Sequence, residues 1–390
     1  MQNITTSNQV DVSFHPEAFE EALWEYYASL RVHGEVFWAA AQRSFIVQSH
    51  TLAEAVLRSR DFRSDHPFRR SRLAFGQTLI NTDGPQHRMQ RQFVTAELGG
   101  RALRGVIEDT VVPAVDELVQ ACVGRGVVDI HQEYAVPLPW RVACRLVGVE
   151  ESAVDFLEPS VVTLTRFLDD TRLSVEQLLK DREIIEGNTR ERLQDATTGL
   201  LGRAREALAS GTWDEETLVR ATTLMLSATT QSTVGAIGIM MHTLVTQSRW
   251  QAALRAGRVS VADFVREVLR WEPPLHLVLR FANGRMQLGG QNVPSGSAIQ
   301  VNLAAANRDP DVFLLPDIFD PTRQSRDDLS FGRGVHTCPG SRMATAELEL
   351  TLQGFLDATD WIEAESVQPI AGRNFRVAKG LIIRCHERKS

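Results

Sequence analysis

The order of apolar and polar residues divides the chain into an early mixed part, a long helical part and a late strand-rich part. Residues 16–32 have the apolar spacing of a helix, and the short apolar run at 45–47 predicts a strand. From about residue 85 to residue 270, charged and apolar residues recur at helical spacing. The helices predicted in this part include 100–123, 174–209 and 261–271.

The pattern changes after Trp271. Pro273 and Pro274 end the preceding helix, and short apolar runs bounded by glycine and proline follow. These runs predict strands at 286–290, 298–301 and 380–383, with a final helix at 341–356 before the last of them.

Together these patterns predict a mainly α protein with small β-sheets. We find no internal repeat and no low-complexity linker that would divide it, so a single domain over 1–390 is expected. About residues 1–15 are expected to form a flexible N-terminal segment.

One apolar stretch, 221–245, has no Asp, Glu, Lys or Arg, and its length would span a bilayer. It also contains a group of polar residues between 227 and 233, which the hydrocarbon of a membrane would disfavour. A helix buried at the centre of a large protein explains the stretch better than a membrane span does.

Composition narrows the class of protein. The chain has 390 residues with 43% hydrophobic and 23% charged positions, which is typical of a globular protein with a large core. Its net charge of −7 argues against nucleic-acid binding, which usually needs a basic excess. The four cysteines form no CxxC pair, and the N-terminus has no apolar stretch, so we expect a cytoplasmic protein with reduced thiols.

The most informative segment runs from Phe331 to Gly340, with the sequence FGRGVHTCPG. Gly332 and Gly334 permit a tight loop that presents one side chain outward. Cys338 lies at the entry of the following helix, where backbone N–H groups and the helix dipole favour a thiolate. A thiolate is a good ligand for iron, whereas an isolated cysteine would more often be a buried core residue.

This segment resembles the haem-binding loop of the cytochrome P450 family, Phe-Gly-x-Gly-x-His-x-Cys-x-Gly. The resemblance implies that Cys338 is the axial ligand of haem b, with the haem between the long central helix and the cysteine loop. It extends from roughly residue 20 to residue 385. The matching loop positions are Phe331, Gly332, Gly334, His336, Cys338 and Gly340.

Further motifs fit the same family. Glu267 and Arg270 match its Glu-x-x-Arg pair, which packs the core behind the haem together with a further Arg or His. The resemblance also implies that haem propionates are bound by cations, because two carboxylates inside a protein require positive partners. The implied propionate partners are His87, Arg91, Arg280 and His336.

The resemblance implies an enzyme that takes two electrons from a redox partner, consumes O₂ and inserts one oxygen atom into a small organic substrate of specialised metabolism. Thiolate ligation favours the O–O cleavage that this reaction needs. The expected electron donors are a ferredoxin and its reductase, as in the bacterial members without a membrane anchor.

The central helix departs from the family pattern. An acid and an alcohol usually relay protons toward oxygen there; the residues at the matching positions are Thr229, Gln231 and Ser232. Ser232 keeps the hydroxyl, but the amide of Gln231 cannot supply a proton as a carboxylic acid does. Either Ser232 and water suffice for ordinary oxygen insertion, or the enzyme uses peroxide or catalyses coupling, desaturation or rearrangement.

Pro339 is a second departure. A residue other than proline here would have an N–H that can point at the thiolate sulfur. Its absence predicts a more electron-rich sulfur and a lower iron potential, although proline also suits the start of a helix.

The substrate side is predicted less sharply. Arg69, Arg70 and Arg72 would either bind an acidic substrate or form a solvated surface. The apolar pocket walls implied by the family are Leu224, Ala228, Leu275, Leu277, Val278, Phe375 and Val377.

Two other classes of protein remain open. A haem-based binding or sensing protein would share the cysteine loop but would not turn over substrate with reductant and oxygen. A zinc site at His336 and Cys338 is disfavoured because no further Cys or His ligands lie nearby in the sequence.

Overall fold

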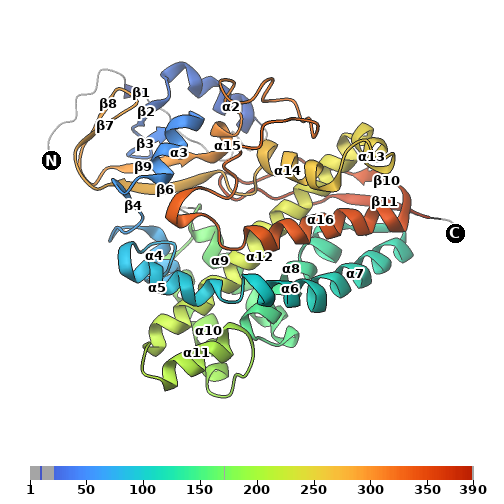
Figure 1. Cartoon of the computed structure of the whole chain (residues 1–390), viewed down its shortest axis with the longest axis horizontal. Coiled ribbons are helices and arrows are strands. Elements are labelled where there is room, and N and C mark those ends of the chain that lie inside the picture. The colour runs from blue at the N-terminus through green and yellow to red at the C-terminus, as the bar shows by residue number, and fades with distance from the viewer. Residues whose placement is uncertain (1–8, 11–21, 171, 389–390) are drawn as a thin grey trace. The chain divides into compact units, whose positions relative to one another are not determined.

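The computed structural model describes residues 9–10, 22–170 and 172–388, which form two compact units (Figure 1). The strand unit comprises Met1–His66, Arg266–Cys338 and Ile370–Arg376, and the helix unit comprises Pro67–Val265, Pro339–Pro369 and Val377–Ser390. The segment expected to be flexible, about residues 1–15, lies outside the described residues apart from Gln9 and Val10, which form β1.

The strand unit is built around a six-stranded sheet in the order β1-β2-β3-β9-β6-β4. Strands β1 and β2 are parallel, as are β3 and β9, and the other neighbours are antiparallel. Its strands are β1 (Gln9–Val10), β2 (Val36–Ala39), β3 (Ser44–Val47), β4 (Phe62–Arg63), β6 (Leu277–Ala282) and β9 (Ala298–Asn302), beside the hairpin β7 (Met286–Leu288) and β8 (Gln291–Val293). Its helical segments are α2 (Leu23–Leu30), η1 (Arg31–His33), α3 (His50–Arg58), α15 (Leu303–Ala306) and η5 (Gly334–His336).

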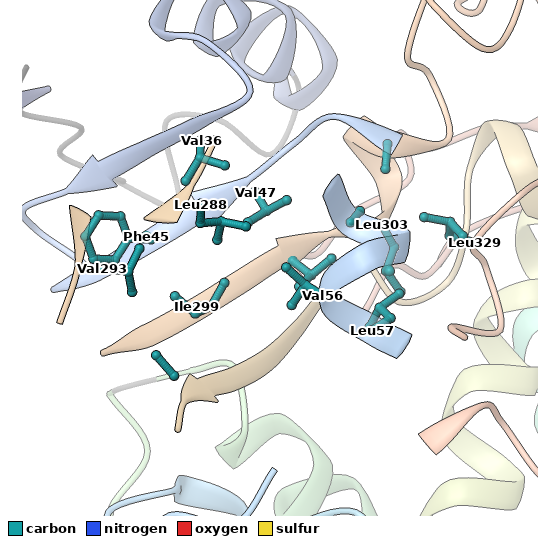
Figure 2. Close-up of a cluster of buried hydrophobic side chains, with 14 residues drawn as sticks. Val36, Phe45, Val47, Val56, Leu57, Leu288, Val293, Ile299, Leu303 and Leu329 are labelled. Carbon is teal, nitrogen blue, oxygen red and sulfur yellow. The ribbon is translucent and has the colours of Figure 1, made fainter. Parts of the chain in front are cut away.

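Alternation along β2 and β3 sorts their side chains onto two faces of the sheet. Phe45 and Val47 join a cluster with α3, whereas Ile46 between them joins a cluster with α2. Figure 2 shows the first cluster, in which Val56 and Leu57 of α3 gather with strand residues and with Leu329. The strand predicted at 45–47 is therefore confirmed, and α3 is fixed against the sheet.

The helix unit contains most of the helices and one small sheet. Its helical segments are α4 (Arg70–Phe75), α5 (Gly84–Thr95), α6 (Gly100–Val106), η2 (Ile107–Val111), α7 (Val112–Arg125), η3 (His131–Ala135), α8 (Pro137–Val147), η4 (Glu151–Ala153), α9 (Val154–Phe167), α10 (Val175–Leu193), α11 (Gly199–Ala209), α12 (Glu215–Thr246), α13 (Ser248–Arg255) and α16 (Ser341–Ala358). Its sheet has the order β10 (Thr359–Ser366), β11 (Ile382–Glu387) and β5 (Val127–Asp129). Helix α14 (Val261–Trp271) has residues in both units.

Two of the predicted helices are interrupted. The prediction over 100–123 becomes α6 and α7 joined by the π turn η2, and Pro113, which lacks an N–H, lies in the turn that follows. The prediction over 174–209 becomes α10 and α11. Thr197 and Thr198 lie in that break, and such residues suit a helix N-terminus better than a helix interior.

Helix α12 is the charge-free stretch of the sequence extended at both ends. Asp214 starts it by accepting a hydrogen bond from the backbone N–H of Thr217 at 2.8 Å. Within the helix unit it packs against α8, α9, α10 and α16. Among the described residues it is the one helix long and apolar enough to cross a membrane, yet 78% of its most apolar window is buried. Such burial is typical of a central core helix.

Helix α16 packs against α7 and α12 and places a carboxyl group in the interior of the helix unit. Glu347 is 1% exposed, and its Oε2 atom has no hydrogen-bond partner in the part of the chain that the structure describes. Burial raises the pKa of Glu347 from 4.5 to about 8. The group is therefore mostly a neutral acid at pH 7.

Candidate functional site

Cys338 lies at the end of a compact loop in the strand unit. The backbone N–H of Gly332 donates to Leu329 O at 2.8 Å, and that of Cys338 donates to Phe331 O at 2.9 Å. Between them η5 forms one 3₁₀ turn, closed by the N–H of Thr337 on Gly334 O at 3.1 Å. These bonds fold the loop back on itself just before Cys338.

Gly334 explains why the loop fits against α3. Its φ is +75°, and a Cβ atom there would collide with the backbone oxygen of Leu57 at the end of α3. Gly332 also has a positive φ, +67°, but open space around its Cα. Both glycines are therefore needed for conformation, and Gly334 also for close packing.

Side chains far away in the sequence fix the start of the loop. The Oγ of Ser330 donates to Leu269 O at 2.8 Å and accepts from Asn307 Nδ2 at 3.0 Å. The Oδ1 of Asn307 accepts from the N–H of Leu329 at 2.6 Å. The cysteine loop is thus bound directly to the Glu-x-x-Arg helix α14.

The four cysteines differ in a way that singles out one of them. Burial raises the pKa of Cys122 to about 12 and the pKa values of Cys144 and Cys385 to about 11, so these three are inert core thiols. Cys338 is the one cysteine of the four that is partly exposed. It is therefore the most accessible thiol of the four.

The Glu-x-x-Arg pair forms a buried ionic cluster. Arg270 donates from Nε and Nη2 to the two carboxylate oxygens of Glu267, both at 2.7 Å. The further cation of the motif, which the sequence left unspecified, is Arg323, whose Nε lies 3.4 Å from Glu267 Oε1. The N–H of Asp320 donates to the same oxygen at 2.9 Å. The pair ties α14 to the segment that leads to the cysteine loop.

The strand β6 carries several predicted residues. Arg280 is 6% exposed and pairs in register with Ile299 of β9. Leu277 and Val278 are partly exposed, and Leu275 forms an isolated antiparallel bridge with Phe375. Cys338, Arg280, His336 and these apolar residues therefore belong to one unit.

The other predicted cofactor partners are in the helix unit. His87 and Arg91 lie one turn apart on one face of α5, as their spacing predicts. His87 is 3% exposed, and Arg91 is partly exposed. Gly340 lies just before Ser341, the first residue of α16. Pro339 therefore precedes the N-cap residue Gly340. It does not occupy the first position of the helix, where proline is favoured.

Side chains of α12 are accessible at the positions that depart from the family pattern. Ala228 is exposed, and Thr229, Gln231 and Ser232 are partly exposed, whereas 221–227 and 233–241 are buried. The spacing puts these four residues, the accessible face of α12, on one side of the helix. The Oγ of Ser232 donates to Ala228 O at 3.4 Å, a weak bond that leaves this hydroxyl able to choose another partner.

Leu224 lies one turn before Ala228 and is 3% exposed. Val377 is partly exposed and belongs to the helix unit, whereas Phe375, two residues earlier, belongs to the strand unit. The predicted pocket walls are thus divided between the two units.

Arg70, in the arginine segment before α5, fits neither of its two predicted roles. Arg70 donates from Nε to Phe167 O at 2.8 Å and from Nη2 to Asp170 O at 3.0 Å, and its guanidinium stacks over the Phe167 ring at 3.9 Å. Burial lowers its pKa. Arg70 is therefore neither part of a solvated surface nor a free anion receptor, because its donors already bind the C-terminal end of α9.

Comparison with known proteins bears on these features. A family model described as cytochrome P450 matches residues 174–380. Cytochrome P450 107B1 of Saccharopolyspora erythraea is 31% identical over 72% of this chain and 70% of its own length. The chain belongs to the cytochrome P450 family. Vitamin D3 dihydroxylase of Streptomyces griseolus is 29% identical over 72% of this P450 and 70% of its own length.

Solved P450 structures share the fold. P450BioI in complex with an acyl carrier protein that carries hexadec-9Z-enoic acid has a TM-score of 0.86 at 22% identity, over 95% of this chain and all (100%) of that chain. The P450 enzyme CxnD, for C–S bond formation in chuangxinmycin biosynthesis, has a TM-score of 0.87 at 23% identity, over 98% of both chains. The predicted family and the mainly α fold with small sheets are confirmed, and the protein is a P450 oxidoreductase.

The residues present fit the haem that the family implies. Cys338 offers an accessible soft thiol, the type of donor that suits iron. The loop that holds it packs too closely at Gly334 for any larger residue there. The cations Arg280 and Arg91 are suited to carboxylates.

Sequence reasoning missed part of the P450 site. Asn307 and Ser330 fix the cysteine loop through hydrogen bonds that the local sequence does not predict. Glu272, His276 and Arg376 are all at most 4% exposed and form a second buried ionic cluster. Glu272 and His276 are unusual polar residues around Pro273-Pro274, but Arg376 joins them only through the fold.

Proposed function

We propose that this P450 binds haem b through the thiolate of Cys338 and works as a monooxygenase that depends on O₂ and a reductant. Its substrate is a small organic molecule of specialised metabolism, and it acts in the cytoplasm as a single domain. The observation that carries the proposal is the exposure of Cys338 alone among the cysteines, on a loop bound to the Glu-x-x-Arg helix.

Haem with a thiolate ligand supplies oxygen activation and O–O cleavage. The chain supplies the ligand and the charges around it. Arg280, His336, His87 and Arg91 are proposed to neutralise the propionates, as the family resemblance implies. Phe331, Gly332 and Gly340 shape the loop that presents the sulfur.

The names of relatives support hydroxylation of small molecules. One is the Vitamin D3 dihydroxylase already described, and 6-deoxyerythronolide B hydroxylase of Saccharopolyspora erythraea is 30% identical over 72% of this chain. Electrons are proposed to come from a ferredoxin and its reductase, as the family resemblance implies.

The accessible face of α12 suggests how protons would move. Ser232 offers a hydroxyl that can both donate and accept, and water beside it can complete a relay. Gln231 can position that water through its amide but cannot change its own protonation near neutral pH. The proton source in this interpretation is water, rather than a carboxylic acid.

The same face favours a second candidate function. With an amide in place of the acid and Thr229 in place of a smaller residue, proton delivery is weaker than the family pattern provides. Such a P450 would suit peroxide, or an oxidative coupling, desaturation or rearrangement without net oxygen insertion. Gln231→Glu tests this: a changed fraction of reductant that ends in product supports a role for the amide, and an unchanged fraction removes it.

The first experiment compares haem ligation in wild type, Cys338→Ser and Cys144→Ser. Wild type should show a thiolate-type Soret band, and Cys338→Ser should lose it. Cys144→Ser should keep the band, because Cys144 is a buried core thiol. Haem that binds without thiolate character in the wild type would refute the proposal. Turnover that needs ferredoxin, reductase and O₂ together would then establish the monooxygenase, and turnover with peroxide alone would favour the second candidate.

A further inference from the structure

Two segments of the strand unit that lie about a hundred residues apart in the sequence run side by side at 274–277 and 374–376. Leu275 and Phe375 form an antiparallel bridge at their centre. The N–H of Arg376 donates to Pro274 O at 2.9 Å, and the N–H of His276 donates to Asn374 O at 2.9 Å. Backbone bonds thus flank the bridge on both sides.

The side chain of Asn374 adds a third connection. Its Oδ1 accepts from the N–H of Leu277 at 2.7 Å. Leu277 is the first residue of β6. On this edge of β6, strand β4 pairs only with the last two residues of β6, Phe281 and Ala282. Asn374 therefore takes the place of a strand partner at the beginning of β6 and fixes its register relative to Phe375.

A buried ion pair completes the connection. The Nε of Arg376 donates to Glu272 Oε1 at 2.8 Å, and the indole N–H of Trp24 donates to Glu272 Oε2 at 2.6 Å. Burial opposes ionisation of Glu272, but the neighbouring His276 and Arg376 side chains outweigh burial and hold its pKa at about 2. Glu272 is therefore a charged, fully buried partner for Arg376 at neutral pH.

The turn before Phe375 is equally constrained. Gly372 has a φ of +96°, and a Cβ atom there would collide with the backbone oxygen of Phe375. A guanidinium N–H of Arg376 also donates to Gly372 O. The position of Phe375 is thus set by bonds on both sides of it rather than by its own packing alone.

We propose that Asn374, Arg376 and Glu272, the wall clamp, are positioning residues that hold Leu275 against Phe375 and so determine which ligands fit beside the iron. The proposal rests on the proposed function, because it takes Leu275 and Phe375 as pocket walls. Its specific content is that ligand selectivity depends on a side chain, Asn374, that need not touch the ligand.

The test uses two azoles that ligate haem iron and differ in size, imidazole and 4-phenylimidazole. Each is titrated into haem-loaded wild type, Asn374→Ala and Asn374→Asp while the Soret shift is followed. Asn374 is only partly buried, so its substitution should leave the fold intact. Asn374→Ala removes the hydrogen bond from the N–H of Leu277 and should weaken 4-phenylimidazole about fivefold, with imidazole unchanged. Asn374→Asp keeps the acceptor for the N–H of Leu277 and should restore the wild-type ratio.

A second variant reaches the clamp from the other side. Gly372→Ala should shift the same ratio, because it moves the turn that carries Phe375. Its matched control is Gly296→Ala, where φ is also positive at +77° but nothing lies within 4 Å of the added carbon. This control separates loss of the clamp from backbone strain alone.

The outcomes distinguish failure of the wall clamp from failure of the proposed haem-thiolate function. If neither azole shifts the Soret band of the wild type, the proposed function fails and the pocket wall with it. If both azoles shift it but Asn374→Ala and Gly372→Ala keep the wild-type ratio, the wall clamp is refuted and the haem-thiolate function stands. Equal weakening of both azoles would also refute the clamp, since it would indicate a general loss of structure.

Discussion

Replacing Glu347 by glutamine tests how the interior of the helix unit treats a carboxyl group. Glu347 is 1% exposed, and burial raises its pKa from 4.5 to about 8. Glutamine has nearly the shape of the protonated acid but cannot ionise. The substitution therefore removes the titration while keeping the volume of the side chain.

The sign follows from proton binding. Between pH 4.5 and 8 the folded state retains a proton on Glu347 that the unfolded state releases, so stability falls as pH rises through this range. At pH 7 the loss covers about 2.5 pH units at about 1.4 kcal/mol each, or about 3 kcal/mol. Above pH 8 it approaches a plateau of about 5 kcal/mol.

The assay is urea unfolding of wild type and Glu347→Gln between pH 5 and pH 9. The two should be nearly equal in stability at pH 5, and Glu347→Gln should become progressively more stable toward pH 8. Glu349→Gln is the matched control, because Glu349 lies on the same helix but is only partly buried, so its pKa is raised much less. A stability difference that does not change with pH would refute the reasoning.

Two further predictions concern the haem and the arginine segment. Pro339→Leu restores a backbone N–H beside the sulfur and should raise the reduction potential of the iron in a redox titration; equal potentials would discard the electronic effect of proline. Arg70→Ala should lower the free energy of unfolding by about 1 kcal/mol, because it removes bonds to Phe167 O and Asp170 O, and should weaken carboxylic and neutral ligands alike. A selective loss of carboxylic ligands in a Soret titration would instead support an acid-binding role.

The local geometry of the candidate site could be predicted because its residues lie close together in the sequence. Cys338 and the two loop glycines lie within a few residues, and their conformational needs can be inferred without a fold. Glu267 with Arg270 and His87 with Arg91 each lie on one helix, where spacing fixes the shared face. The bounds of α14 agree with the predicted 261–271, because the apolar spacing and the two prolines that define this helix are also local in the sequence.

Other predictions depended on contacts that spacing does not encode. The helix predicted over 174–209 breaks in two, and the propensity of single threonines gave too weak a signal to place the break. The sequence around Arg70 is typical of a surface cation, but its contacts with Phe167 and Asp170 come from a distant segment. The third member of the Glu-x-x-Arg cluster, Arg323, is 56 residues from Glu267 in the sequence.

The sequence by itself determined that this chain is a P450, that Cys338 matches the cysteine of the family's haem-binding loop, and that α12 has Gln231 where the family has an acid. These are properties of residue type and short spacing. Only the tertiary structure decided that Asn307 and Ser330 fix the cysteine loop, and that Arg376 neutralises Glu272 across 104 residues. The physical reason is that a buried polar group must find a partner in space, and the choice of partner is made by packing between distant segments rather than by neighbours along the chain.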